Sequence, residues 1–139
     1  MDIFQNRILN IVKKFLLYWL PVILWAGLIF YLSGVPNLNS GMQVFWDVFW
    51  RKLAHATEFG ILNLLLFRAL WGYTWSFKKA LWWSLILSGL YAVSDELHQY
   101  FVPMRQCRWQ DVAQDSLGTL AVSFILLLGR YKNILSSRA

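Results

Sequence analysis

The sequence predicts an all-α membrane protein with four transmembrane helices and a short interfacial aromatic segment between the first and second helices. Apolar residues make up 58% of the 139 residues, and only 14% are charged, which is too few to cover a water-exposed surface. A soluble domain is rarely more than about half apolar. Four segments are long enough, or nearly so, to cross a hydrocarbon core of about 30 Å, which needs about 20 helical residues.

The first predicted helix, residues 15–32, carries no charge. It contains Pro21, which a membrane helix tolerates near its start. Lys13 and Lys14 precede it as in a signal peptide, but the apolar run is longer than a signal-peptide core and no small-residue cleavage site follows. We therefore expect this helix to remain as an anchor.

The other three predicted helices are residues 53–70, 80–98 and 111–129. His55 and Glu58 lie near the start of the second helix, and Asp115 lies one turn inside the fourth. With no internal repeat or interdomain linker, one domain is predicted over residues 1–139.

The connection between the first two predicted helices has two parts. Residues 33–39 are rich in turn-forming residues and predict a loop. Residues 44–50 are aromatic but too few to span a membrane, so they are expected to lie in the interface.

The charges sort by segment. Nine cations flank one side of the predicted helices: Arg7, Lys13, Lys14, Arg68, Lys78, Lys79, Arg130, Lys132 and Arg138. Four flank the other side: Arg51, Lys52, Arg105 and Arg108. The positive-inside rule therefore places the N- and C-termini in the cytoplasm. This dispersal also argues that the net charge of +6 reflects membrane topology rather than nucleic-acid binding.

Six of the seven acidic residues and both histidines lie on the predicted outer side, and the exception is Asp2. At helical spacing, polar residues share one face on each of three predicted helices. The face of the second helix consists of Arg51, His55 and Glu58, and that of the fourth consists of Asp111, Asp115 and Gly118. On the third helix, Tyr91, Asp95 and His98 share a face, with Glu96 and Gln99 beside them. Lipid cannot solvate such groups, so all three faces are expected to turn towards each other. Gly118 would allow close approach of a neighbouring helix.

One interpretation of this constellation is structural. The acids would pair with the outer cations and fasten the helix ends together. This explains the charge balance but explains the histidines less well, because neutral hydrogen-bonding residues would fasten helices at a lower desolvation cost.

A second interpretation is chemical. Imidazoles and carboxylates within reach of one another can act as general acids and bases, and the candidate catalytic residues are His55, Glu58, Asp95, Glu96 and His98. The same side chains suit a divalent metal such as zinc, but their spacing matches no established metal motif, so no cofactor is predicted.

A third interpretation is binding of a membrane lipid or lipid-linked glycan. The candidate ligand-binding residues are Arg51, Lys52, Gln99, Arg105, Asp111 and Asp115. Arginine can grip phosphate bidentately, and nearby aromatic residues can hold a sugar or lipid chain. A proton- or ion-coupled transporter and a purely structural membrane partner remain alternatives, as does an oligomer.

The combined pattern resembles the VanZ-like family of small bacterial membrane proteins. The matching residues are Arg51, Lys52, His55 and Glu58-Phe59-Gly60; then Ser94-Asp95-Glu96, His98-Gln99, Phe101, Pro103 and Arg105; then Asp111, Asp115 and Gly118. The chain differs from the usual pattern of the family at two positions. It has Met104 where the family often has Gly, and Asp115 where the family often has Asn. The family takes its name from a protein associated with teicoplanin resistance, so the resemblance implies a cell-envelope role in the bacterial cytoplasmic membrane.

Overall fold

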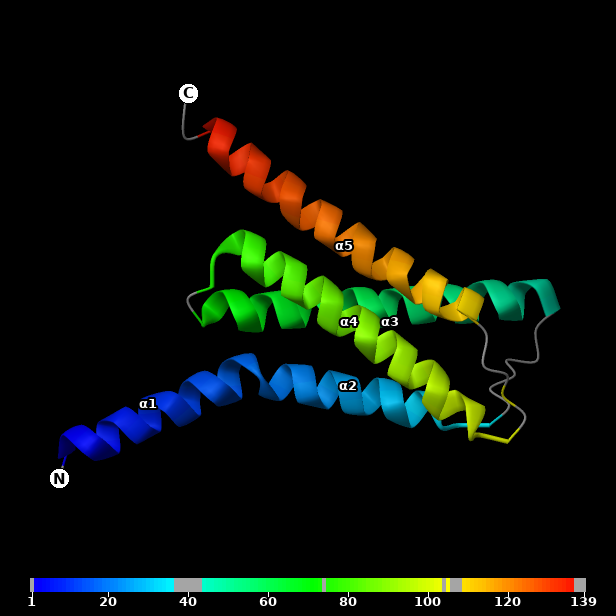
Figure 1. Cartoon of the computed structure of the whole chain (residues 1–139), viewed down its shortest axis with the longest axis horizontal. Helices are drawn as coiled ribbons and strands as arrows, with labels where there is room; N and C mark the ends of the chain where they lie inside the picture. The colour runs from blue at the N-terminus through cyan, green and yellow to red at the C-terminus, as the bar shows by residue number, and fades with distance from the viewer. Residues whose placement is uncertain (1, 37–43, 74, 104, 106–108, 137–139) are drawn as a thin grey trace.

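The computed structural model describes residues 2–36, 44–73, 75–103, 105 and 109–136. Within these residues the chain forms five helices and no strand, which confirms the all-α prediction (Figure 1). The helices are α1 (Asp2–Tyr18), α2 (Leu20–Ser33), α3 (Val44–Gly72), α4 (Phe77–Tyr100) and α5 (Trp109–Ser136). The start of α1 and the end of α5 lie at the same end of the bundle, here called the terminal end.

The predicted first helix is instead two helices, because α1 already begins at Asp2 and bends into α2 at Trp19 (Figure 1). Pro21 explains the bend. It has no N–H to donate to the carbonyl of Leu17, four residues back, and its ring crowds that carbonyl. Arg68 of α3 donates its Nη1 to the Leu17 carbonyl at 3.2 Å, so the acceptor that Pro21 leaves free finds a partner.

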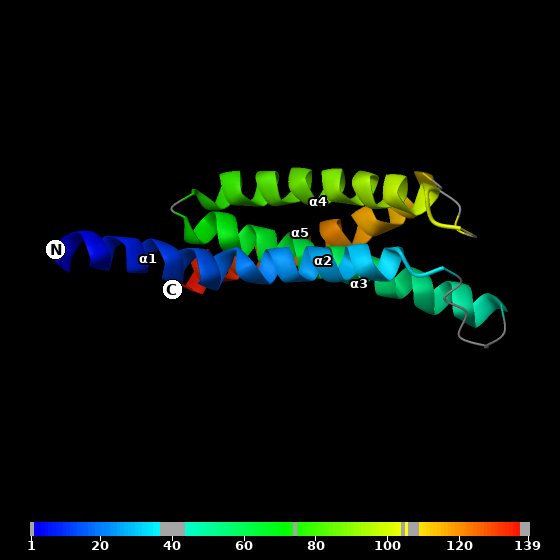
Figure 2. The ribbon, with the colours of Figure 1, turned by 90° about the horizontal axis from the view of Figure 1, so that it is seen from below.

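The aromatic residues 44–50 are not a separate element, because they form the first two turns of α3. This start of α3 projects past the neighbouring ends of α4 and α5 (Figures 1 and 2). Phe45, Trp46, Phe49 and Trp50 are exposed there.

Three stretches are long and apolar enough to cross a membrane, namely Phe4–Ser33, Phe45–Gly72 and Trp109–Tyr131. The predicted crossing by α4 is not among them. Serines and the adjacent Asp95 and Glu96 reduce the hydropathy of this helix, which buries its polar face against α3 and α5. Its N-terminus is capped by Ser76, whose hydroxyl accepts the Lys79 N–H at 3.4 Å.

Helix α3 is the centre of the bundle and contacts each of the other four helices. Midway along it, Phe59 and Leu62 pack with Val22 and Ile29 of α2. Nearer the terminal end, a second apolar cluster joins α3 to α4 and consists of Phe67, Leu70, Phe77, Ala80 and Leu81. In lipid such contacts stabilise mainly through close packing, because lipid tails are as apolar as the side chains.

The tightest contact is between α3 and α5. Gly118 lies so close to α3 that a Cβ at this position would overlap the carbonyl oxygen of Ala56, which confirms the predicted close approach. Further along, Asn63 donates its Nδ2 to the Thr119 carbonyl at 3.1 Å and to Ser123 Oγ at 2.9 Å. These contacts fix the register of α5 on α3 and thereby the position of Asp115, one turn before Gly118.

Candidate functional site

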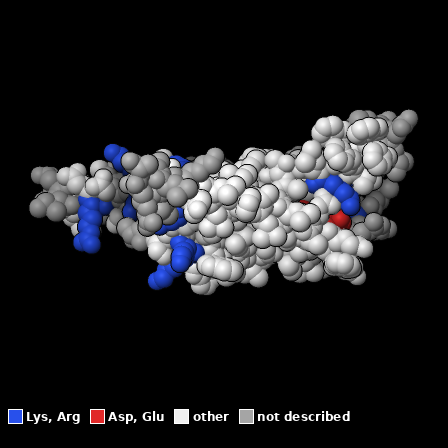
Figure 3. Space-filling model, turned by 90° about the horizontal axis from the view of Figure 1, so that it is seen from above, with Lys and Arg blue, Asp and Glu red and all other residues white. Residues whose placement is uncertain are grey.

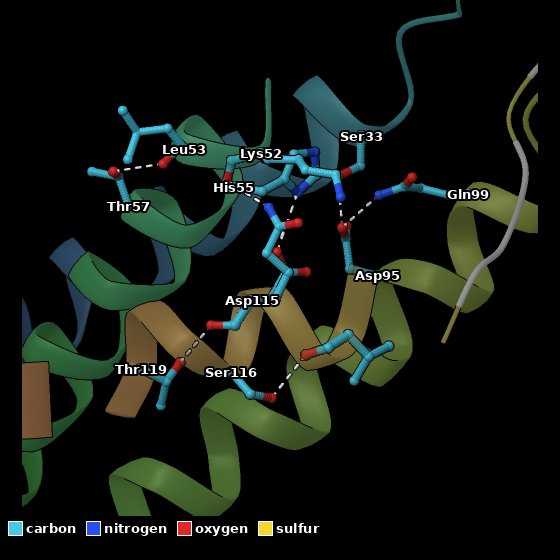
Figure 4. A network of polar contacts seen from close by, with 12 residues as sticks. Ser33, Lys52, Leu53, His55, Thr57, Asp95, Gln99, Asp115, Ser116 and Thr119 are labelled. Atoms are coloured by element: carbon cyan, nitrogen blue, oxygen red, sulfur yellow. Dashed lines mark hydrogen bonds and ion pairs between the residues drawn. The ribbon is translucent and has the colours of Figure 1, made fainter. Parts of the chain in front are cut away.

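Polar side chains gather at the end of the bundle opposite the terminal end, where α2 and α4 end and α5 begins (Figure 4). We call the following residues the polar cluster: Ser33, His55, Asp95, His98, Gln99, Arg105 and Asp115. They come from α2, α3, α4, α5 and the segment after α4. The structure therefore brings together side chains that lie up to eighty positions apart in the sequence.

Asp95 lies at the centre of the polar cluster and is only 3% exposed. Its Oδ2 accepts hydrogen bonds from Ser33 Oγ at 2.8 Å and from Gln99 Nε2 at 2.9 Å (Figure 4). Its Oδ1 is buried and has no hydrogen-bond partner among the described residues. One oxygen thus joins α4 to the end of α2, and the other keeps its accepting capacity.

Arg105 fastens the same junction from the segment after α4. Its Nη2 donates to the carbonyls of Leu32 and Val35, both at 3.1 Å, and its Nη1 donates to Gln99 Oε1 at 3.2 Å. Its Nε also reaches the Val35 carbonyl, at 3.3 Å. The last carbonyls of a helix lack intrahelical partners, so Arg105 caps α2. Most of its donors are therefore engaged within the chain, although binding to a ligand was predicted for it.

The surroundings of Arg105 are strongly charged. Burial lowers the pKa of its guanidinium, and Arg51 lowers that pKa further, whereas Asp95, Glu96 and Glu58 raise it. An arginine remains protonated in spite of such a shift. Arg105 therefore supplies a permanent positive charge among the carboxylates of this end of the bundle.

Replacing Arg105 with lysine is expected to lower the free energy of unfolding by about 2 kcal/mol, because an ammonium group cannot reproduce the forked contacts with α2 and Gln99. The measurement is steric trapping of the full-length protein in bicelles. Arg51→Lys is the matched control, since Arg51 is exposed and pairs with Asp47 of its own helix. Equal losses in the two variants would contradict the capping role.

Asp115 and His55 form the second part of the polar cluster. Asp115 Oδ1 lies 3.7 Å from His55 Nδ1, and the two side chains are 1% and 20% exposed. This distance is too long for a hydrogen bond. Both oxygens of Asp115 and the Nδ1 of His55 are buried without a hydrogen-bond partner among the described residues.

His98 completes the polar cluster from the last turn of α4. Its ring stacks on Phe30 of α2, with ring centroids 4.0 Å apart and an interplanar angle of 23°. Its Nε2 faces Gly34, where a Cβ would lie 3.4 Å away. That nitrogen is also buried without a partner in the described part of the chain.

Other predicted site residues lie at the edge of the polar cluster or outside it. Arg51 is exposed and pairs with Asp47 of its own helix at 3.0 Å. Lys52 is exposed, and its carbonyl accepts Gln114 Nε2 at 2.8 Å. Asp111 is half-buried in the first turn of α5.

Two further acids were predicted as catalytic residues. Glu96 is buried next to Asp95 on α4. Glu58 is half-buried on α3, and its carbonyl accepts Trp25 Nε1 at 2.9 Å. The predicted outer cation Arg108 and the lone Cys107 lie outside the described residues.

Several polar partners were missed at the sequence level. Ser33 was expected in a loop, but it is the last residue of α2 and binds Asp95. Its position directly after an uninterrupted apolar run was the available signal. Gln114 and Trp25 bind backbone carbonyls of α3, and nothing in the sequence singles out those acceptors.

The described residues contain no group of three or more His, Cys, Asp or Glu side chains placed to hold a metal ion.

Apolar helices that bury two aspartates and partly bury two histidines at one end define a class of protein, an α-helical membrane protein with an internal polar site. The family model described as VanZ/LLP1 matches residues 10–130. The chain belongs to this family. No curated protein and no solved structure matches it.

Proposed function

We propose that the polar cluster binds the head group of an envelope lipid or lipid-linked glycan at the outer face of the bacterial cytoplasmic membrane, with both termini in the cytoplasm. The observation that carries this proposal is a set of buried atoms without hydrogen-bond partners in the described chain: Asp95 Oδ1, both Asp115 carboxylate oxygens, His55 Nδ1 and His98 Nε2. Leaving each such group unsatisfied costs about 1–3 kcal/mol. A bound head group would offset this cost.

The chemistry of the polar cluster favours hydroxyl or ammonium groups over a bare phosphate. Two carboxylates accept hydrogen bonds from hydroxyl groups, but they repel a phosphate placed against them. Imidazole nitrogens can donate or accept. A sugar is therefore the best match for the interior of the site.

The rim of the site suits the rest of such a molecule. Arg51 and Lys52 are exposed at the same end of α3 and can meet a phosphate that links the sugar to its lipid. Trp46, Trp50 and Trp109 are also exposed there and can contact the sugar or the lipid chain. A phosphate-linked glycolipid fits both the interior and the rim.

Modification of the bound head group is a second candidate function, favoured by one specific contact. The His55 imidazole, 3.7 Å from the buried Asp115 carboxyl group, can receive a proton from a hydroxyl group of the bound molecule. His98, Glu58, Asp95 and Glu96 would supply further acid or base groups in this function.

Proton- or ion-coupled transport is less well supported. Among the described residues, the polar side chains buried in the bundle beyond the polar cluster are Asn63, Ser84, Ser88, Thr119 and Ser123, all uncharged, and nearer the terminal end α3 and α4 bury the apolar cluster of Phe67, Leu70, Phe77, Ala80 and Leu81. Ionisable stations of the kind that usually mark a coupled path would be needed there. The position of the polar cluster at one end of the bundle favours access of a ligand from one side of the membrane.

Native mass spectrometry of the full-length protein in mild detergent, incubated with bacterial envelope lipids, tests the proposal. The wild type and the control Asp47→Asn should retain a glycolipid, and Asp95→Asn should lose most of it. Asp47→Asn is a suitable control because it is the same substitution at the same end of the bundle, but outside the polar cluster. A wild-type protein that remains bare would contradict the proposed function.

A further inference from the structure

Helix α1 has a surface that no other part of the described chain covers. Every described side chain from Phe4 to Leu17 is exposed. The helix reaches beyond the α3–α4 connection at the terminal end (Figures 1 and 2). The sequence predicted a first helix only from residue 15, whereas α1 begins at Asp2.

The two sides of α1 differ in chemistry. At 3.6 residues per turn most of the polar side chains fall on one stripe, made of Asn6, Arg7, Asn10, Lys13 and Lys14, while Gln5 lies at the edge of the opposite side. The opposite side is apolar and consists of Phe4, Ile8, Ile11, Val12 and Phe15. An apolar side facing a basic stripe is the pattern of a helix that lies in the plane of a membrane surface.

Length places the first part of α1 outside the hydrocarbon core. The apolar stretch Phe4–Ser33 contains 30 residues, which as a helix would measure about 45 Å. The core is about 30 Å thick, so about ten residues extend beyond it. Because Ser33 lies at the polar cluster on the opposite side, the excess lies at the start of α1.

Neighbouring side chains mark the level at which α1 leaves the core. The Lys14 ammonium group lies 4.8 Å from the centre of the Tyr73 ring, and the Arg68 guanidinium lies 5.3 Å from that of Tyr18. Trp75, Ser76, Lys79 and Trp83 line a surface hollow of about 540 Å³ after the end of α3. Aromatic and basic residues of this kind are typical of the membrane–water interface.

The distribution of charge on the surface is consistent with a membrane boundary near the terminal end. In the space-filling view, Lys and Arg gather at the terminal end, while the middle of the visible face is uncharged (Figure 3). A second, smaller group of basic atoms lies near the other end, beside an acidic one. The uncharged band is the part of this face that suits lipid chains.

We propose that residues 4–14 of α1 bind the anionic lipid surface of the leaflet at the terminal end. The apolar side enters the boundary between head groups and lipid chains, and Arg7, Lys13 and Lys14 contact lipid phosphates. The bend at Trp19 gives α1 a direction different from that of α2, which crosses the core. This role is independent of ligand binding in the polar cluster.

The test compares two single labelling positions in the full-length protein, each in a Cys107→Ser background. A nitroxide spin label is attached at Ile8→Cys on the apolar side or at Asn10→Cys on the polar stripe. The proteins are reconstituted into vesicles of phosphatidylcholine alone or mixed with phosphatidylglycerol. Collisions with oxygen report contact with lipid, and collisions with a water-soluble nickel chelate report contact with water.

In vesicles with phosphatidylglycerol, the ratio of oxygen to nickel collisions should be about tenfold higher for the label at Ile8 than for that at Asn10. Without anionic lipid, or with Arg7, Lys13 and Lys14 all replaced by glutamine, this difference should shrink severalfold. Lys52→Gln, at the opposite end of the bundle, should leave it unchanged. The lipid comparison uses the natural cations and therefore does not depend on folding of the triple variant.

Two results would overturn the proposal. Equal exposure of both labels to water in both membranes would show that α1 projects into solution. Magnetic coupling between labels on separate molecules would show instead that a second copy covers the apolar side.

Discussion

Replacing Gly118 with alanine should lower the free energy of unfolding by about 3 kcal/mol or more, at the upper end of the cost of overpacking. The added methyl group would overlap the carbonyl oxygen of Ala56, which is part of the α3 backbone and cannot turn aside as a flexible side chain can. α3 and α5 must therefore separate. Steric trapping in bicelles measures the change.

Glycines elsewhere in the helices provide the controls for Gly118. A Cβ at Gly89 or Gly129 meets nothing within 4 Å. Alanine at these positions should leave the protein as stable as the wild type, or stabilise it by up to about 1 kcal/mol through its better helix propensity. If all three variants lost stability equally, the close contact between α3 and α5 would not be the cause.

Replacing Asp95 with asparagine should leave the bundle folded but weaken head-group binding about a hundredfold, which corresponds to about 2.7 kcal/mol. The amide oxygen of asparagine can still accept the hydrogen bonds of Ser33 and Gln99. Its NH₂ group replaces Oδ1, the carboxylate oxygen without a partner in the described chain. A hydroxyl group of the ligand would then meet a donor in place of an acceptor.

Asp95→Leu separates this effect from a structural one. Leucine cannot accept from Ser33 or Gln99, so the junction of α2 and α4 loses both bonds and the protein should be destabilised by about 2 kcal/mol or more. Binding isotherms and unfolding free energies measured on both variants distinguish the two roles. If the Asp95→Asn variant bound the head group as tightly as the wild type, the role of Asp95 would be limited to holding α2 and α4 together.

The helical class and the end of the bundle at which polar residues meet could be predicted from the sequence, because both depend on local spacing. Polar residues three positions apart, such as His55 and Glu58 or Asp95 and His98, share one side of a helix, and lipid turns that side inward. The close approach at Gly118 follows from the same reasoning. Glycine has no side chain, so on the inward side of a helix it lets the backbone of a neighbouring helix come close.

Features that depend on contacts distant in the sequence could not be predicted. Arg105 caps α2 through carbonyls about seventy residues earlier in the chain, a role that its position in the sequence does not indicate. The helical conformation of α1 was missed because Lys13 and Lys14 were taken as the boundary of a membrane segment. Arg51 pairs within its own helix with Asp47, although its spacing suggested an inward position beside His55.

Photo-crosslinking tests the central claim, binding of a head group in the polar cluster, most directly. The full-length protein in membranes is exposed to a lipid-linked sugar that carries a photoreactive group on the sugar, and the modified peptides are mapped. Our account predicts adducts within residues 95–103 and 109–118, lost in Asp95→Asn and kept in Asp47→Asn. Adducts spread along the lipid-facing helices, or unchanged by Asp95→Asn, would contradict it.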